Sequence, residues 1–250
     1  MRLVNKFLDR ITGKVERDIT YVDLDAVQEL LGYHFHNERL LLLSLTHRSF
    51  TRYDPEHCPS NERLEFLGDS VLGLIISDQL FSDNPDLREG KLTKTKAKLV
   101  NEVALAEVAN AVGLPQHLRL SPEEDRSGGR TRPSIISDAF ESVIAAIYLD
   151  GGLDAARDVI LRLLYTRRET ILNSRAQRNF KGELLELVQG QGIPMPHYEV
   201  VSEAGPDHEK EFTVNVQVLG EIKGRGVGNT KKEAEQKAAA SALRSMRSRS

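Results

Sequence analysis

The chain has 250 residues, a mass of 28.0 kDa, and 40% apolar and 28% charged residues, a composition typical of a globular protein. This length allows one or two domains, each with its own core. No apolar run approaches the roughly 18 residues that cross a bilayer. The single cysteine, Cys58, excludes an intrachain disulfide and fits a reducing compartment.

The charge is unevenly distributed along the chain. A net charge of −3 and a pI near 6.2 argue against a protein that binds nucleic acid through bulk positive charge. Residues 1–20 carry a net charge of +2, residues 178–250 carry +1, and residues 21–177 carry −6. A function that depends on carboxylates is therefore expected in the middle of the chain.

Residues 1–20 form an N-terminal extension. Leu3, Phe7 and Ile11 recur at four-residue spacing, which predicts an amphipathic helix. Acidic residues interrupt the segment, and it lacks the continuous apolar stretch of a secretion signal. A helix packed on the protein is expected, and a helix lying on a membrane surface is the alternative.

Residues 21–172 have a helical pattern throughout, with apolar residues at three- and four-residue steps. Glycine and proline pairs divide this region into about seven expected helices. The polar stretch 173–179 is interpreted as a linker.

The pattern changes after the linker. A short helix is expected at 180–189, strands at 198–202, 211–219 and 221–226, and a final helix from 231 to about 246. This α-β-β-β-α order over residues 180–250 predicts a small second α+β domain after the all-α domain.

Three carboxylates share one face of a predicted helix near residue 65. Glu62, Glu65 and Asp69 fall within about 60° of one another, while Leu64 points toward a core. Their mutual repulsion would be relieved by a cation, and oxygen ligands suit Mg²⁺ or Mn²⁺. A solvated acidic face is the alternative.

A second acidic pair favours the metal interpretation. Asp138 and Glu141 lie on a helix that is apolar nearly all round, which predicts burial. Buried carboxylates need partners, and residues 133–149 contain no lysine or arginine. The simplest explanation places this pair opposite Glu65 and Asp69, around shared metal.

These segments resemble a known family. Residues 61–70 (NERLEFLGDS) closely resemble the signature segment of ribonuclease III, and residues 138–152 resemble its second signature helix. The resemblance runs from about residue 30 to residue 246. It implies an all-α endonuclease domain followed by a double-stranded-RNA-binding domain.

The resemblance also implies a mechanism. Glu65, Asp69, Asp138 and Glu141 would be the catalytic metal ligands, with Mg²⁺ as the cofactor and Mn²⁺ as a substitute. Double-stranded RNA would be hydrolysed to 5′-phosphate and 3′-hydroxyl ends by a cytoplasmic homodimer. The implied substrates are ribosomal RNA precursors and some messenger RNAs.

Other residues have less specific signals. Glu62 and Glu89 match further acidic positions of the family, with supporting roles. Asn61 would orient the motif or serve as a helix N-cap. His47 is expected to be a packed, hydrogen-bonded core histidine, and a catalytic role is the alternative. Lys96 stands where the family usually has an arginine, in a region that approaches RNA, so it would supply a point charge there.

The second domain has its own candidate RNA contacts. Lys231 and Lys232 begin the last helix and suit phosphate, and His208 lies on a loop expected to reach a minor groove. Leu185 and Gly182 depart from the family pattern and place the contacts of the first helix in question. The rival hypothesis is a double-stranded-RNA binder without catalysis, which has no reason to retain four mutually repelling carboxylates.

Overall fold

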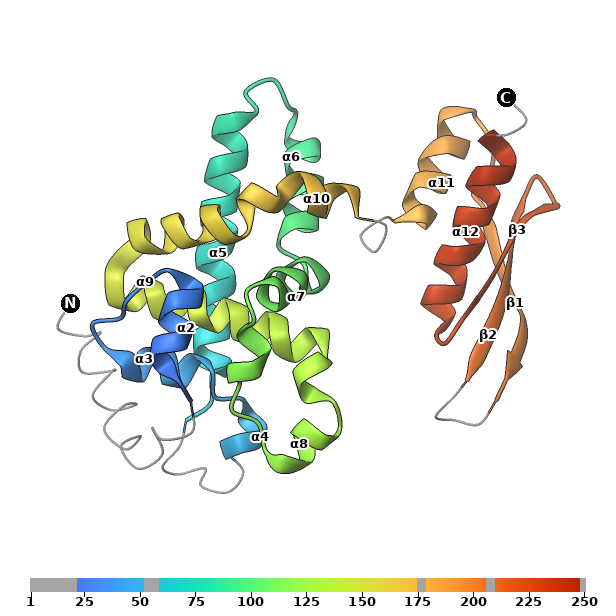
Figure 1. Cartoon of the computed structure of the whole chain (residues 1–250). Coiled ribbons are helices and arrows are strands. Elements are labelled where there is room, and N and C mark those ends of the chain that lie inside the picture. Colours follow the sequence, from blue (N-terminus) through green and yellow to red (C-terminus); the bar gives the residue numbers. More distant parts are fainter. Residues whose placement is uncertain (1–21, 52–58, 175–178, 206–209, 248–250) are drawn as a thin grey trace. The chain divides into compact units, whose positions relative to one another are not determined.

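The fold is given by a computed structural model that describes residues 22–51, 59–174, 179–205 and 210–247 (Figure 1). The chain divides into two compact units, Met1–Gln177 and Arg178–Ser250. The amphipathic segment expected at 1–20 lies outside the described residues. No helix in the described ranges is long and apolar enough to cross a membrane.

The first unit is helical, as expected. Nine α-helices occur in its described part, where the sequence predicts about seven, because α4, α8 and α10 are too short to show an apolar period. Its elements are α2 (Leu24–Leu31), α3 (Glu38–Ser44), α4 (Arg48–Thr51), α5 (Glu62–Asp83), α6 (Glu89–Leu99), α7 (Glu102–Ala111), α8 (Pro122–Arg126), α9 (Pro133–Leu163) and α10 (Arg168–Asn173), with short 3-10 turns at Leu114–His117, Gly129–Thr131 and Tyr165–Arg167.

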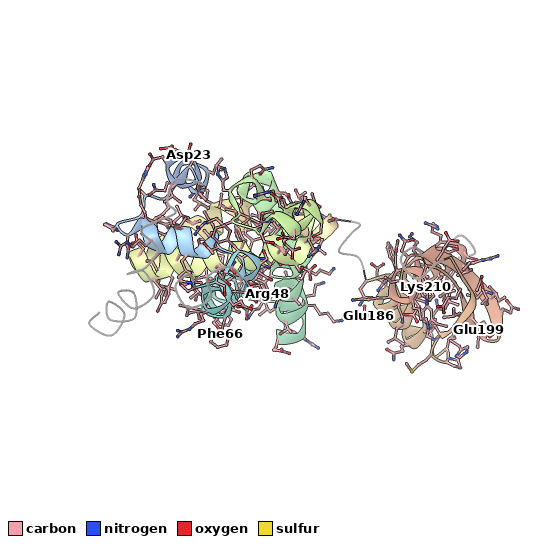
Figure 2. The ribbon with its side chains drawn as sticks, turned by 90° about the horizontal axis from the view of Figure 1, so that it is seen from below. Asp23, Arg48, Phe66, Glu186, Glu199 and Lys210 are labelled. Atoms are coloured by element: carbon pink, nitrogen blue, oxygen red, sulfur yellow. The ribbon has the colours of Figure 1, made fainter. Side chains whose placement is uncertain are left out.

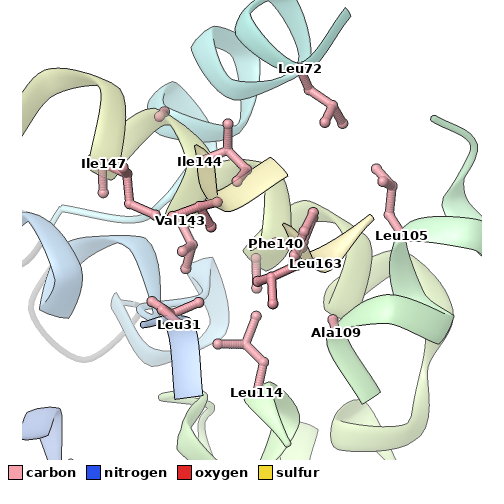
Figure 3. Packing of buried hydrophobic residues seen from close by; sticks show 14 of the residues in the cluster. Leu31, Leu72, Leu105, Ala109, Leu114, Phe140, Val143, Ile144, Ile147 and Leu163 are labelled. Atoms are coloured by element: carbon pink, nitrogen blue, oxygen red, sulfur yellow. The ribbon is translucent and has the colours of Figure 1, made fainter. Parts of the chain in front are cut away.

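The core of this unit is built around α9. Phe140 is fully buried, and α2, α5 and α7 contribute Leu31, Leu72 and Leu105 to the same cluster (Figure 3). The apolar stretch 143–147 is also fully buried, which accounts for a helix that is apolar nearly all round. Charged side chains on α9 therefore lie at the few positions of the helix that remain accessible to solvent.

Two glycines shape the packing of α9. A Cβ atom on Gly68 of α5 would overlap the carbonyl oxygen of Glu141, so only glycine lets the two helices approach this closely. Gly152 has φ 83° and ψ −174°, which interrupts α9 and turns its last third. This interruption falls at the Gly151–Gly152 pair, one of the glycine and proline pairs expected to divide the helices.

The second unit has the expected α-β-β-β-α order. Its elements are α11 (Phe180–Gly190), β1 (His197–Ala204), β2 (Glu211–Val218), β3 (Glu221–Gly228) and α12 (Lys231–Arg247). The strands form an antiparallel sheet in the order β1-β2-β3. Alternate β2 side chains face the helices and are buried with the alanine face of α12. At Gly224 and Gly226 of β3, a Cβ atom would overlap the α12 backbone, so glycine permits close packing of helix and strand.

Candidate active site

Helix α5 presents an acidic face near its start. Glu65 is partly buried, whereas Glu62 and Asp69 are exposed. Leu64 and Val71 are 3% and 6% exposed and anchor the opposite face in the core. The predicted division of this helix into an acidic and an apolar side is therefore present.

Helix α9 places two more carboxylates beside this face. Asp138 and Glu141 are partly buried, and the residues between them, Ala139 and Phe140, are almost completely buried. The carboxylates of Glu65, Asp138 and Glu141 each offer an oxygen, and these oxygens all lie within 4.8 Å of one another. Two segments far apart in the sequence thus contribute to one acidic cluster.

The electrostatics of the cluster are repulsive. Burial, followed by the charges of Asp69, Asp138 and Glu65, raises the pKa of Glu141 to about 8. Burial and the charge of Asp138 raise the pKa of Glu65 above its usual range. Burial raises the pKa of Asp138 too, although a hydrogen bond from Ser137 partly opposes the shift. A bound cation would stabilise all three ionised forms.

Asn61 fixes the start of α5 against its neighbours. It occupies the N-cap position, but its side chain makes no capping hydrogen bond. Its amide nitrogen instead donates to the Ser44 carbonyl at 3.3 Å, and its own carbonyl accepts from Ser142 Oγ at 3.2 Å. Asn61 therefore links α3, α5 and α9. Its side chain does not cap α5, so of the two expected roles its contacts fit the orienting one.

Comparisons with known proteins identify the family of this chain. Residues 37–167 match the family model "Ribonuclease-III-like", and residues 180–246 match "Double-stranded RNA binding motif". The chain belongs to the ribonuclease III family. It is thus an endonuclease of the hydrolase class, as the sequence predicts.

Individual relatives support the same membership. "Ribonuclease 3" of Streptomyces coelicolor is 48% identical over 87% of this chain and 78% of that protein, and "Ribonuclease 3" of Nocardia farcinica is 47% identical over 90% and 93%. A solved ribonuclease III nuclease domain from Campylobacter jejuni is 40% identical, with a TM-score of 0.54, over 58% of this chain and 97% of that one.

The remaining acidic positions of the ribonuclease III motif are not equivalent. Asp69 is exposed and is not one of the three clustered residues, although its charge acts on Glu141. Glu62 accepts a hydrogen bond from Ser60 Oγ at 2.7 Å and lines the same cavity as Glu65. Glu89 is exposed at the start of α6, where it accepts a hydrogen bond from Thr93 at 2.8 Å.

The cavity beside the cluster is lined by basic as well as acidic side chains. Its volume is about 260 Å³, and its lining includes Glu65 and Asp138 together with His47, Arg48 and Arg132. His47 is hydrogen-bonded to Ser49, as expected, but it is half-buried at the cavity wall and is not a core residue. Neither arginine was assigned a role from the sequence, although Arg48 lies in a segment, residues 45–49, that resembles the family. Arg48 begins α4 and Arg132 precedes α9, and the fold brings them to one cavity.

The expected RNA-binding residues have different environments. Lys96 is partly buried on α6, and its ammonium group lies beside Gly73 of α5. Lys231 and Lys232 are exposed at the start of α12, and Lys231 Nζ lies 5.5 Å from the centroid of the Phe212 ring. His208 lies outside the described residues.

The first helix of the second unit, α11, is capped at its N-terminus by Asn179. Asn179 Oδ1 accepts a hydrogen bond from the Gly182 amide at 3.0 Å and caps α11. A Cβ atom on Gly182 would come within 2.9 Å of Nδ2 of the Asn179 side chain, so glycine suits this cap. Leu185 is partly exposed on the same helix.

Proposed function

We propose that this ribonuclease III family member is a Mg²⁺-dependent endoribonuclease that hydrolyses double-stranded RNA to 5′-phosphate and 3′-hydroxyl ends. The observation that carries the proposal is the convergence of Glu65, Asp138 and Glu141 from two helices. All three donors are carboxylate oxygens, and this hard ligand set suits Mg²⁺, with Mn²⁺ as a substitute, and not zinc. The resemblance to the family adds Asp69, one turn further along α5, as a fourth proposed ligand, although it lies outside the three clustered residues.

The chemistry follows from the charge in this site. Metal bound there would lower the pKa of an attacking water and neutralise the extra charge on the phosphate in the transition state. The four carboxylates would hold the ion, and Glu62 and Glu89 would have supporting roles. Asn61 keeps α5 and α9 aligned through its contacts with Ser44 and Ser142.

The two units have different proposed functions, catalysis in the first and RNA binding in the second. Residues 21–172 are the proposed catalytic domain, residues 173–179 the linker and residues 180–250 the double-stranded-RNA-binding domain. Lys231 and Lys232 combine side-chain charge with a helix N-terminus, which suits backbone phosphates. His208 and Lys96 are further proposed contacts. Such domains recognise A-form shape with little base specificity. The proposed substrates are ribosomal RNA precursors and structured messenger RNAs, and the proposed location is the cytoplasm.

A homodimer is the proposed assembly. Phe66, Leu74 and Phe81 lie along α5 and are 80%, 57% and 72% exposed, and Figure 2 shows Phe66 at the rim of the unit. Exposed apolar residues at this spacing form a stripe that is costly in water and typical of an interface. The Campylobacter jejuni nuclease domain is described as having a region involved in dimer formation.

A cleavage assay tests the proposal. A labelled RNA duplex is incubated with the full chain in Mg²⁺ or in EDTA, and the product ends are identified by phosphatase and ligase treatment. We expect cleavage only with Mg²⁺ and products with 5′-phosphates. Duplex binding without cleavage under both conditions would favour the rival hypothesis of a non-catalytic RNA-binding protein.

A further inference from the structure

The cavity beside the acidic cluster contains nitrogen donors that the proposed metal site does not use. His47, Arg48 and Arg132 line it together with Glu65 and Asp138. A second cavity of about 510 Å³ shares His47 and Arg48 and extends along α8. The donors thus line two adjoining cavities, one of which also contains two of the clustered carboxylates.

The tautomer of His47 follows from its hydrogen bonds. The backbone N–H of Ser49 donates to His47 Nδ1 at 3.2 Å, so Nδ1 must be an acceptor. Ser49 Oγ lies 2.9 Å from the same nitrogen and itself accepts from the Ser121 amide at 3.0 Å. The ring proton is therefore on Nε2. Burial lowers the pKa of His47, which favours this neutral form.

The proton on Nε2 has no acceptor among the described residues, and His47 lines both cavities. A directed N–H donor beside the carboxylate cluster is thus open to a ligand. The ligand must supply an acceptor oxygen, because the protein offers a donor there.

Arg48 is weakly paired within the described part of the chain. Its Nη1 lies 3.7 Å from a Glu62 carboxylate oxygen, and its side chain is 71% exposed. Arg132 is paired with Glu124 on the same cavity. Arg132 thus offsets the charge of Glu124, whereas Arg48 is only weakly paired with Glu62. Glu65 and Asp138 belong to the proposed metal set, so a bound cation would offset their charge and allow an anion in the cavity.

We propose that His47, Arg48 and Arg132 form a phosphate subsite, which binds a non-bridging oxygen of the backbone phosphate next to the scissile one. The inference rests on the proposed function, because the phosphate belongs to the RNA strand being cut. A guanidinium group binds phosphate through paired N–H donors, and the His47 Nε2–H adds a neutral donor of fixed direction. The subsite sets which phosphate of the strand lies at the carboxylates.

Protein variants give the first test. Arg48→Ala and His47→Ala should each lower kcat/KM by about tenfold or more, because each loses a hydrogen bond to a charged group. His47→Gln should recover most of the activity, because its amide nitrogen reaches the position of Nε2. Arg126→Ala is the matched control, since Arg126 pairs with Glu123 at 3.7 Å and lines neither cavity. Melting temperatures establish that the variants fold.

Modified duplexes give the second test and need no folded variant beyond Arg48→Ala. Single methylphosphonates remove the charge of one phosphate at each position flanking the cleavage site. Wild type should lose affinity and rate by about tenfold at one flanking position, and Arg48→Ala should lose nothing further there. Single 2′-deoxy substitutions at the same positions should have little effect.

The outcomes separate the subsite from the proposed function. No cleavage of any duplex by wild type would overturn the proposed function itself. Normal cleavage with equal methylphosphonate penalties in wild type and Arg48→Ala would overturn the subsite alone. A penalty from 2′-deoxy substitution alone would assign the donors to a sugar hydroxyl, and so overturn the phosphate subsite.

Discussion

At the scale of single residues, Glu141 is the carboxylate of the site whose pKa is raised to about 8 by burial and neighbouring charges. It lies on a helix whose neighbouring side chains fill the core, and its own side chain is partly buried. Its ionised form is opposed by burial and by the charges of Asp69, Asp138 and Glu65. A residue kept under such unfavourable conditions is typical of a functional site.

Replacing Glu141 separates catalysis from RNA binding. Glu141→Gln keeps the size of the side chain but removes a charged ligand, so we expect the cleavage rate to fall by more than about 100-fold while duplex affinity stays near that of wild type. Gel-shift titration and single-turnover cleavage measure the two properties. Glu107→Gln, an exposed carboxylate on α7, is the control. Normal cutting by Glu141→Gln would remove this residue from the site.

The raised pKa of Glu141 predicts a pH dependence. A proton must leave the carboxyl before it binds metal, so metal affinity should rise between pH 6 and pH 8. In metal-free protein the free energy of unfolding shows the opposite trend. The contribution of Glu141 to stability is fully present below the unfolded pKa near 4.5, and it is lost as pH rises through the folded pKa of about 8. Calorimetric Mn²⁺ titration and urea unfolding measure the two trends. Equal slopes in wild type and Glu141→Gln would contradict the assignment.

At the scale of elements, the contact between α5 and α9 determines whether the carboxylates meet. Gly68 permits this contact because any larger residue would overlap the Glu141 backbone. The same α5 residues that face α9 thus set the spacing of the acidic cluster. Packing and metal binding are therefore coupled through one glycine.

The coupling can be tested with two glycine substitutions. Gly68→Ala should destabilise the protein by about 2 kcal/mol or more and weaken metal binding, because the helices must move apart. Gly90→Ala in α6 meets no atom within 4 Å and should instead be neutral or stabilising by up to about 1 kcal/mol. Urea unfolding and Mn²⁺ titration of both variants provide the comparison. Equal behaviour of the two would show that the close approach has no effect.

At the scale of the whole molecule, the exposed stripe of α5 determines the proposed assembly. Phe66, Leu74 and Phe81 leave a large apolar surface in water on a single chain. Phe66→Asp should shift the protein toward monomer in sedimentation analysis by placing a charge in the interface. Met195→Asp, a change at a similarly exposed apolar residue of the other unit, should leave the assembly unchanged. A wild-type monomer at micromolar concentration would contradict the homodimer.

The sequence predicted the type and order of most elements, because apolar periods and glycine or proline breaks are local signals. It also predicted the helices that carry Glu65 and Glu141, because acidic residues on apolar helices stand out. It could not predict that Asp69 would lie outside the closest group, nor that Arg48 and Arg132 would share a cavity. Those relations depend on how helices cross, and one such crossing depends on the missing side chain of Gly68.

The most direct measurement is anomalous diffraction from crystals of the full chain soaked in Mn²⁺. The account predicts a peak within about 2.3 Å of carboxylate oxygens from both helices, Glu65 of α5 and Asp138 and Glu141 of α9. The peak should disappear in Glu141→Gln. A manganese ion held by residues of a single helix, or no ion at this cluster, would contradict the shared metal site on which the proposed hydrolysis depends.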